Sequence, residues 1–286
     1  MLLFVIVLSI PACRGGKKGD GKQYNLSASI LKGPAFSNLV NSIVKMEFTI
    51  MGMKTSVDMD IRSDLRFTIL PDSAGLKMMQ MTFDDVQVNI ESPLMSLLGG
   101  KNEKKNLDNG FGKVKGASFI LGINNKGVLQ EAKPVPRADM PADSLAGNDN
   151  LNQPQGREEL QAMLGAMFAY FTPNPVQVGD SWTSESTTSI SQMRSGIKNK
   201  YTLVNVQDNI AEIKVEGNIT ALNEMGKEAL KFAQNIEGKQ KGFMKINLAT
   251  GQVTSSKISM NMEGEIKSEK MNSPMKAEME STYKSK

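Results

Sequence analysis

Apolar and polar residues alternate with a period of two over most of the chain from residue 40 onward. The run from Val40 to Ile50 comes first, and further runs follow as far as the one that ends at Tyr283. Successive side chains of a β-strand point to opposite faces of a sheet, so the alternation predicts antiparallel strands with one buried and one solvated face. Turn-forming residues separate the runs, at Pro71–Gly75, Asn124–Gly127, Gln207–Asn209 and Ala249–Gly251. About a dozen strands joined mostly by short hairpins predict a mainly β fold, a curved antiparallel sheet or half-barrel.

Two segments have the period of a helix instead. From Arg157 to Phe171, six apolar residues recur at the spacing of one helix face before Pro173 stops the pattern: Leu160, Met163, Leu164, Met167, Phe168 and Phe171. We therefore expect an amphipathic helix over this range, packed across one face of the sheet. A second, weaker helix is expected from Glu224 to Glu237, with Asn223 as its N-cap and Gly238 after its end.

The chain of 286 residues is long enough for one large domain or two small ones. We expect residues 23–286 to form a single β-rich domain in two halves, because neither half has enough strands to close on itself. A long surface loop is predicted at residues 133–156, where the chain is rich in Pro, Asp and Asn and has no period.

The N-terminus has the pattern of an export signal. The apolar run from Leu2 to Ile10 has the length of a signal-peptide core and is too short to span a bilayer. Pro11 and Ala12 follow the run, directly before Cys13, the only cysteine of the chain. This arrangement resembles a bacterial lipoprotein signal, which implies removal of residues 1–12 and acylation of Cys13. It departs from that pattern in having Pro11 and no preceding Lys or Arg, and the alternative is an ordinary secretory signal with a buried or stray cysteine.

Residues 13–22 predict a flexible basic tether. This segment has four Lys or Arg residues and one Asp, so it holds +3 of the chain's net charge of +4. A Gly/Lys linker of this kind would lie against anionic headgroups of a membrane. The remaining body has almost no excess positive charge, which argues against a nucleic-acid partner. The tether lacks an acidic cluster for export to the cell exterior, so the expected location is the periplasmic face of the outer membrane.

The composition excludes several kinds of catalytic and metal site. The chain has no histidine and one cysteine, which excludes His-based metal sites, Ser-His-Asp and Cys-His nucleophiles, thiolate zinc sites and intramolecular disulfides. Asp84 and Asp85 are neighbours on a predicted strand and are expected to point to opposite faces. Ser181 has no recognisable activating base. We therefore predict no enzyme, no cofactor and no metal, and a carboxylate-only hydrolase is the least favoured alternative.

Methionine is unusually frequent, with 20 residues, and several methionines form close groups, at Met51–Met53, Met78–Met81 and Met260–Met262. Three interpretations remain open for these groups. Thioethers bind Cu(I), although no histidine or second cysteine completes such a site, and they also fill irregular cores or line flexible apolar grooves. For an apolar ligand groove, the candidate lining residues are Met163, Met167, Phe168, Met260 and Met262.

Several short motifs lie along the domain. The segment Asn174–Trp182 reads NPVQVGDSW and follows the predicted helix, Tyr201–Leu203 reads YTL, and Leu248–Gly251 reads LATG. Met51–Met53 and Thr82–Asp85 precede them. Together these motifs resemble an uncharacterised family of bacterial lipoproteins with a domain of unknown function, in which Val178–Trp182 is the distinctive piece. The resemblance implies a β-rich envelope lipoprotein without an established activity, and the fold is similar by analogy to the half-barrels of lipoprotein and lipid carriers.

These observations lead to two main hypotheses. The chain is expected to be a membrane-tethered periplasmic module that binds an apolar small molecule or an envelope protein. The alternative is a structural or assembly-factor lipoprotein with a solid core and no ligand. An open methionine-lined groove favours the first hypothesis, and a filled interior favours the second.

Replacement of the single cysteine tests the anchor. Because serine has no thiol to acylate, Cys13→Ser is expected to yield an uncleaved or soluble protein instead of one that requires detergent. Fractionation of membranes with and without detergent measures this difference. Membrane association unchanged from the wild type would rule out the anchor.

Overall fold

The structure, a computed structural model, describes residues 21–33, 35–50, 53–93, 115–136, 161, 164–190, 193–224, 233–268 and 271–286. Its strands are β1 (Ala35–Ile50), β2 (Met53–Ile69), β3 (Lys77–Glu91), β4 (Ser118–Ile123), β5 (Leu129–Pro134), β6 (Ser181–Ile190), β7 (Met193–Gln207), β8 (Ile210–Glu224), β9 (Ala233–Asn247), β10 (Val253–Ser268) and β11 (Met271–Ser285). The short 3-10 helices η1 (Ala28–Ile30) and η3 (Ala166–Phe168) accompany them. No helix in these ranges is long and apolar enough to cross a membrane.

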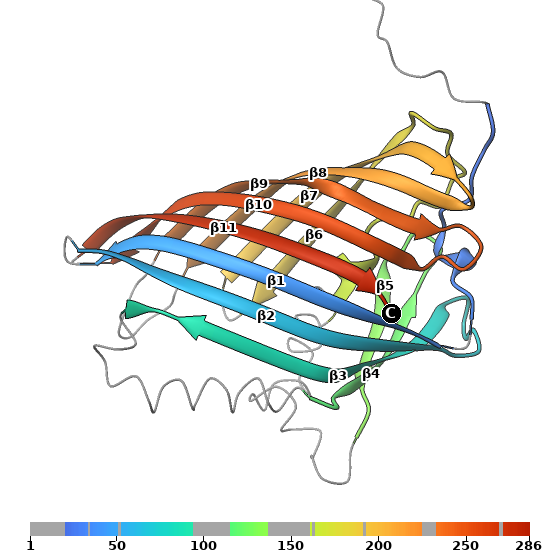
Figure 1. Cartoon of the computed structure of the whole chain (residues 1–286), viewed down its shortest axis with the longest axis horizontal. Coiled ribbons are helices and arrows are strands. Elements are labelled where there is room, and N and C mark those ends of the chain that lie inside the picture. The colour runs from blue at the N-terminus through green and yellow to red at the C-terminus, as the bar shows by residue number, and fades with distance from the viewer. Residues whose placement is uncertain are drawn as a thin grey trace, which may run out of the picture.

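All eleven strands form one antiparallel sheet, in the order β5-β4-β3-β2-β1-β11-β10-β9-β8-β7-β6. The first and last strands, β1 and β11, pair in the middle, so each half of the chain builds one side of the sheet. The edges formed by β6 and by β4 and β5 both lie behind the central strands in Figure 1, which shows how the sheet curls without closing. The prediction of a curved antiparallel sheet is confirmed.

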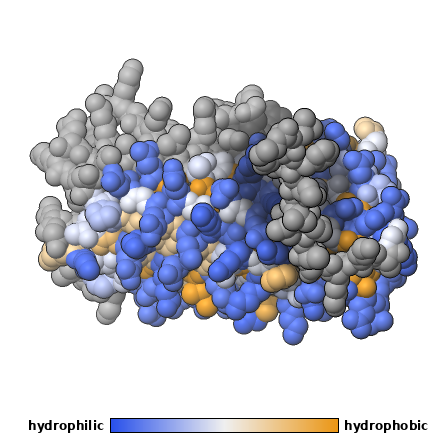
Figure 2. Space-filling view, turned by 90° about the horizontal axis from the view of Figure 1, so that it is seen from above, coloured by the Kyte–Doolittle hydropathy of each residue, from blue (hydrophilic) through white to orange (hydrophobic). Residues whose placement is uncertain are grey.

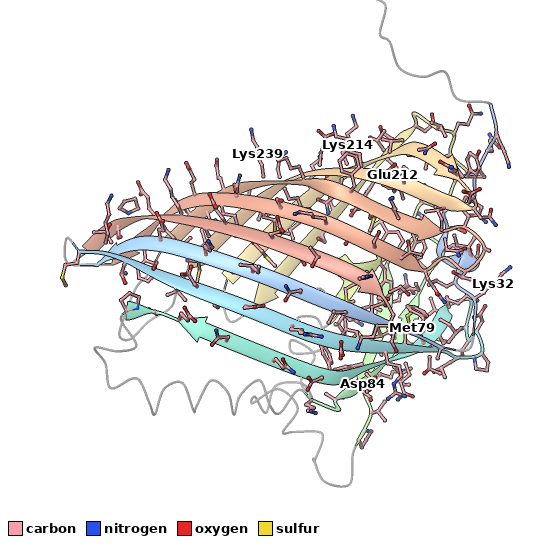
Figure 3. The ribbon with its side chains drawn as sticks, in the orientation of Figure 1. Lys32, Met79, Asp84, Glu212, Lys214 and Lys239 are labelled. Atoms are coloured by element: carbon pink, nitrogen blue, oxygen red, sulfur yellow. The ribbon has the colours of Figure 1, made fainter. Side chains whose placement is uncertain are left out.

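The alternation along each strand separates a concave face from a convex one. On β8, Ile213 and Val215 point to the concave face and are at most 1% exposed. Lys214 and Glu212 lie on the opposite face, and Lys214 points away from the sheet in Figure 3. Seen from above in Figure 2, the described surface is mostly hydrophilic. The apolar side chains therefore gather on the inside of the curl, as the period of two predicts.

Glycines on the concave face permit the curl. A β-carbon on Gly242 of β9 would collide with the carbonyl oxygen of Lys257 on β10, and one on Gly264 of β10 would collide with that of Asn235 on β9. Gly242 pairs with Val215 and Ile258, which places it on the concave side. Glycine inside a strand often marks a bend where backbones approach closely. These positions let the neighbouring strands fold toward each other.

Two segments outside the sheet, residues 24–32 and 164–176, together form what we call the end plug. Tyr24 and Val176 exchange two backbone hydrogen bonds, of 2.8 and 3.0 Å, and Thr172 N–H donates to the Leu26 carbonyl at 3.0 Å. The plug also reaches the hairpin turns, since Lys32 N–H donates to the Thr250 carbonyl at 2.9 Å. Its apolar side chains are buried in the main core, at Leu26, Ala28, Leu31, Leu164, Phe168 and Phe171. The end plug therefore covers one end of the concave face.

The predicted amphipathic helix over Arg157–Phe171 is not supported. Within the described part of that range, Gln161, Leu164 and Gly165 have helical backbone and η3 forms one 3-10 turn, and residues 157–160 and 162–163 lie outside. Leu164 and Phe168 are buried as their spacing predicts, but the adjacent residues Tyr170 and Phe171 are buried too. Because this segment is enclosed on several sides, apolar residues are buried at successive positions. Some of them happen to have the spacing of a helix face, although no regular helix of that length forms in the described part.

The second predicted helix is wrong where the structure describes it. Residues 233–237 belong to β9, and Glu224 ends β8, while residues 225–232 lie outside the described ranges. Ile236 pairs with both Ala221 and Gly264. Pairing on both sides with long neighbouring strands outweighs the local helix preference. Of the expected loop at 133–156, Lys133 and Pro134 end β5, and residues 137–156 are not described.

A methyl group at Gly242 tests the role of these glycines in the curl. We expect Gly242→Ala to lower the free energy of unfolding by about 1–3 kcal/mol, because the added carbon must displace the backbone of β10. The matched control is Gly196→Ala on β7, whose β-carbon would lie 3.1 Å from the Thr220 Oγ1 and is expected to change stability by under about 0.5 kcal/mol. Urea denaturation measures both. Equal effects of the two substitutions would contradict this account of the curl.

Candidate functional site

A cavity of about 270 Å³ lies on the concave face beside the end plug. Strands β1, β2 and β6 to β11 form its floor, and Leu31 and residues 166–170 of the plug cover it. Its apolar wall includes Phe36, Phe67, Val215, Met244, Ile258 and Met260. Small-molecule sites typically start at about 300 Å³, and the share of one liquid water is about 30 Å³, so this space is close to the smallest such sites.

The structure brings together part of the predicted groove lining. Met167 and Phe168 of η3 and Met260 of β10 line the cavity. Met262 lies two residues further along β10, half-buried and opposite Gly238, outside that lining. Met163 and Cys13 lie outside the described residues. The methionines Met79 and Met81 serve a different purpose, since both are fully buried in the packed core.

The cavity floor also contains a polar cluster that sequence reasoning missed. Gln240 of β9, only 6% exposed, donates from its Nε2 to the Asn199 Oδ1 on β7. The Asn199 Nδ2 in turn donates to the Tyr201 hydroxyl at 3.1 Å. Gly217 separates these two side chains on β8, where a β-carbon would collide with the Asn199 Oδ1. The available signal was a polar residue at a concave position of the alternation, flanked by Gly238 and Gly242.

Three of the four tyrosines line the cavity: Tyr170, Tyr201 and Tyr283. Burial raises the pKa of the Tyr170 phenol well above its usual value, and the neighbouring Tyr283 and Tyr201 raise it further. Burial also raises the pKa of Tyr283 and of Tyr201, although hydrogen bonds with Ser184 and Asn199 partly offset the effect at Tyr201. The phenols are therefore neutral at physiological pH. No charged side chain among the described residues lines this space.

The distinctive Val178–Trp182 segment contacts residues that line the cavity. The Asp180 amide donates to the Gln177 carbonyl at 3.0 Å, and Gly179 has a φ of +100°, so this is the expected tight turn. Trp182 then enters β6, stacks on Tyr201 with ring centroids 5.8 Å apart, and donates from its Nε1 to the Tyr170 carbonyl at 2.9 Å. Trp182 thus holds two of the cavity tyrosines. Ser181 shares a hydrogen bond with the Thr202 hydroxyl at 2.8 Å.

The acidic pair does not belong to this site. A β-bulge near Asp64 and Leu65 interrupts the strict alternation, and Asp84 and Asp85 have separate cationic partners. Arg66 contacts Asp84 at 2.8 Å, and Lys115 contacts Asp85 at 2.8 Å. The hydrogen bond from Lys115, supported by Gln87, lowers the pKa of the Asp85 carboxyl below its usual value. Within the described ranges, no group of three or more His, Cys, Asp or Glu residues is arranged to hold a metal.

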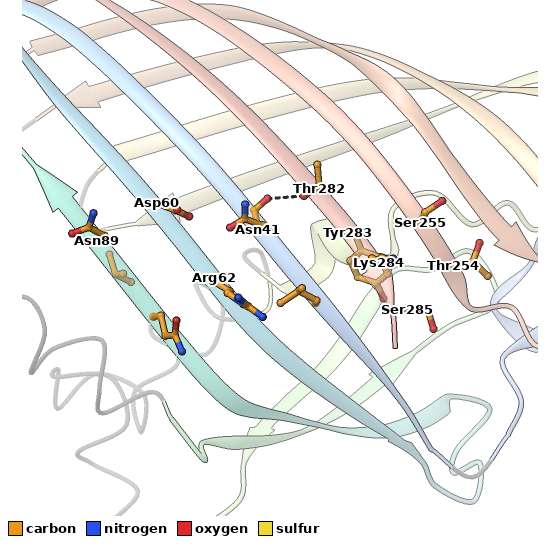
Figure 4. A pocket seen from close by; sticks show the side chains of 13 residues that line it. Asn41, Asp60, Arg62, Asn89, Thr254, Ser255, Thr282, Tyr283, Lys284 and Ser285 are labelled. Carbon is orange, nitrogen blue, oxygen red and sulfur yellow. Dashed lines mark hydrogen bonds between the residues drawn. The ribbon is translucent and has the colours of Figure 1, made fainter.

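A larger hollow of about 960 Å³ lies over the outer side of β1, β2, β3, β10 and β11. Figure 4 shows its polar lining, which includes Asn41, Asp60, Arg62 and Lys284. Thr282 Oγ1 donates to the Asn41 carbonyl there at 3.4 Å. Its side chains are those of a solvated strand face, so size alone does not make it the better candidate site.

Comparisons with known proteins match part of the chain to a family of unknown function. A model of a "Family of unknown function (DUF6263)" matches residues 142–253, which include the turn at Val178–Trp182 and the strands β6 to β9. No curated protein matches the chain. Among solved structures, the chain is similar to the crystal structure of Pseudomonas aeruginosa OccK7 (OpdD), at 7% identity over 89% of this chain and 99% of that one. The TM-score of 0.23 is too low to show a shared fold.

Proposed function

We propose that this chain is a periplasmic lipoprotein, anchored to the outer membrane through Cys13, that binds an apolar molecule on the concave face of its sheet. The main support is the cavity of about 270 Å³ beside η3, which has an apolar wall and no charged lining residue in the described structure. Such a lining favours a ligand that needs no counter-charge. We propose no catalytic role for this site.

The unfilled space favours a ligand over a solid core. Protein interiors pack as densely as organic crystals and hold few voids larger than one water molecule. The plug end follows that rule, since Met79, Leu121 and Ile123 are fully buried. The middle of the concave face departs from dense packing, because it holds the cavity. Met244 and Met260 line this cavity, and their flexible side chains can adapt to a bound molecule.

The point at which the described chain enters the fold supports this combination of anchor and cavity. The described chain enters the fold at Tyr24 in the end plug, where the Lys22 ammonium lies 5.3 Å from the ring centroid of Tyr24. A tether of residues 13–22 spans at most about 35 Å when fully extended. The plug end would therefore face the membrane, and the cavity would lie just behind it.

A structural or assembly-factor lipoprotein remains the second candidate. It is favoured by the filled core beneath the end plug and by the small volume of the cavity. The two candidates differ in one property, which is whether the isolated protein retains a bound molecule.

Native mass spectrometry of the protein lacking residues 1–22, purified without detergent, tests the ligand. We expect a bound mass that organic extraction removes, because an apolar guest stabilises the otherwise empty cavity. Ser256→Phe, at the cavity wall on β10, is expected to displace that mass by filling the space. The control Ser259→Phe lies on the same strand opposite Glu280 and Lys241, on the convex face, and should keep it. A wild-type protein without any bound mass would favour the structural alternative.

A further inference from the structure

We infer that the cavity selects an apolar molecule with an uncharged oxygen head, such as a hydroxyl or a carbonyl, over one with an anionic head. This inference rests on the proposed function and names the ligand class for the same site. It comes from two phenol hydroxyls and one amide oxygen that have no hydrogen-bond partner among the described residues, at a cavity whose lining is mainly apolar.

The phenols supply the donors. Tyr170 is 6% exposed and lines the cavity, yet its hydroxyl has no hydrogen-bond partner among the described residues. Tyr283 on β11 lines the same cavity and is half-buried, and its hydroxyl also has no hydrogen-bond partner among the described residues. Buried tyrosine hydroxyls usually find a partner. A ligand oxygen between these two phenols would supply it.

The amide cluster supplies an acceptor. Gln240 uses its Nε2 to donate to Asn199, so the amide is oriented by the protein. Its Oε1 has no donor in the part of the chain that the structure describes. A ligand hydroxyl can donate to this oxygen while it accepts from a phenol. A site with both phenol donors and an amide acceptor matches an alcohol best, because a hydroxyl can accept and donate. A carbonyl, which can only accept, is the second choice.

Charge decides against an anionic head. A carboxylate or phosphate in this space would lose its hydration and meet no Lys or Arg side chain among the described lining residues. Burial of an unpaired charge is far more costly than burial of a hydrogen-bonded neutral group. The raised pKa of the three phenols points the same way, because it reflects an environment that disfavours negative charge.

The single tryptophan offers a direct readout. Trp182 is the only tryptophan in the chain and contacts both Tyr201 and Tyr170. A brominated ligand in the cavity would quench its fluorescence. The cavity volume corresponds to about nine waters, which suits an eight-carbon chain with one oxygen.

The experiment compares three probes on the full-length chain in phosphatidylcholine vesicles at pH 8, with free probe concentrations measured. The probes are 8-bromooctan-1-ol, 8-bromooctanoate and 1-bromooctane. We expect the alcohol to quench Trp182 with an apparent Kd at least about tenfold below that of the carboxylate, because only the carboxylate buries a charge. Tyr283→Phe is expected to weaken the alcohol about fivefold and leave 1-bromooctane unchanged, as loss of one neutral hydrogen bond predicts. Tyr24→Phe, outside the cavity lining, is the control and should change neither.

The outcomes separate this inference from the proposed function. Equal quenching by all three probes, or the strongest quenching by the carboxylate, would overturn the selection for a neutral head and leave an apolar site. Specific quenching by none of them would overturn the proposed binding function itself. Alcohol preference that survives in both Tyr283→Phe and Tyr170→Phe would contradict the assigned donors.

Discussion

The apolar concave face of an open, curled sheet must be removed from water, and the rest of this structure depends on how that is done. Eleven antiparallel strands leave one face apolar without closing on themselves. The end plug covers part of that face with Leu26, Leu31, Phe168 and Phe171. Its backbone is fixed to the sheet's turns and to itself by hydrogen bonds such as those between Tyr24 and Val176. The cavity lies on the concave face beside the plug, and Leu31 and residues 166–170 of the plug cover it.

The curl and the polar cluster share a cause on β9. Gly238 and Gly242 flank Gln240 on the concave side of that strand, and Gly217 lies opposite Gln240 on β8. Side chains larger than hydrogen at these positions would meet a neighbouring backbone or the Asn199 amide. The glycines therefore let the strands approach closely and also leave the amides of Gln240 and Asn199 room to contact each other. A polar pair held in this way is oriented before any ligand arrives, which reduces the cost of binding.

The sequence predicts the sheet well and the plug poorly, for physical reasons. The alternation of apolar and polar residues is a local signal that does not depend on which strands pair. The runs around Val44, Ile213 and Met260 therefore reveal both the strands and their inward faces. The plug has no such signal: Leu26 and Leu31 lie in a short irregular segment whose partners are distant in the chain. Around Phe168, the chain is buried on several sides, and its apolar residues happen to follow the spacing of a helix face. Met260 was identifiable because apolar side chains on the inner face of an open sheet need cover, and Met167 and Phe168 because their spacing marks an apolar surface that can supply it. The positions of Asn199 and Gln240, in contrast, depend on strand register.

The space between η3 and the floor of β7, β9, β10 and β11 is tested most directly by its electron density in crystals of the protein purified without detergent. The central claim predicts continuous density for an elongated apolar molecule, with one oxygen within about 3 Å of the Tyr170 and Tyr283 hydroxyls. Density explained entirely by the side chains of Met167, Phe168 and Met260, packed together with no space between them, would contradict it.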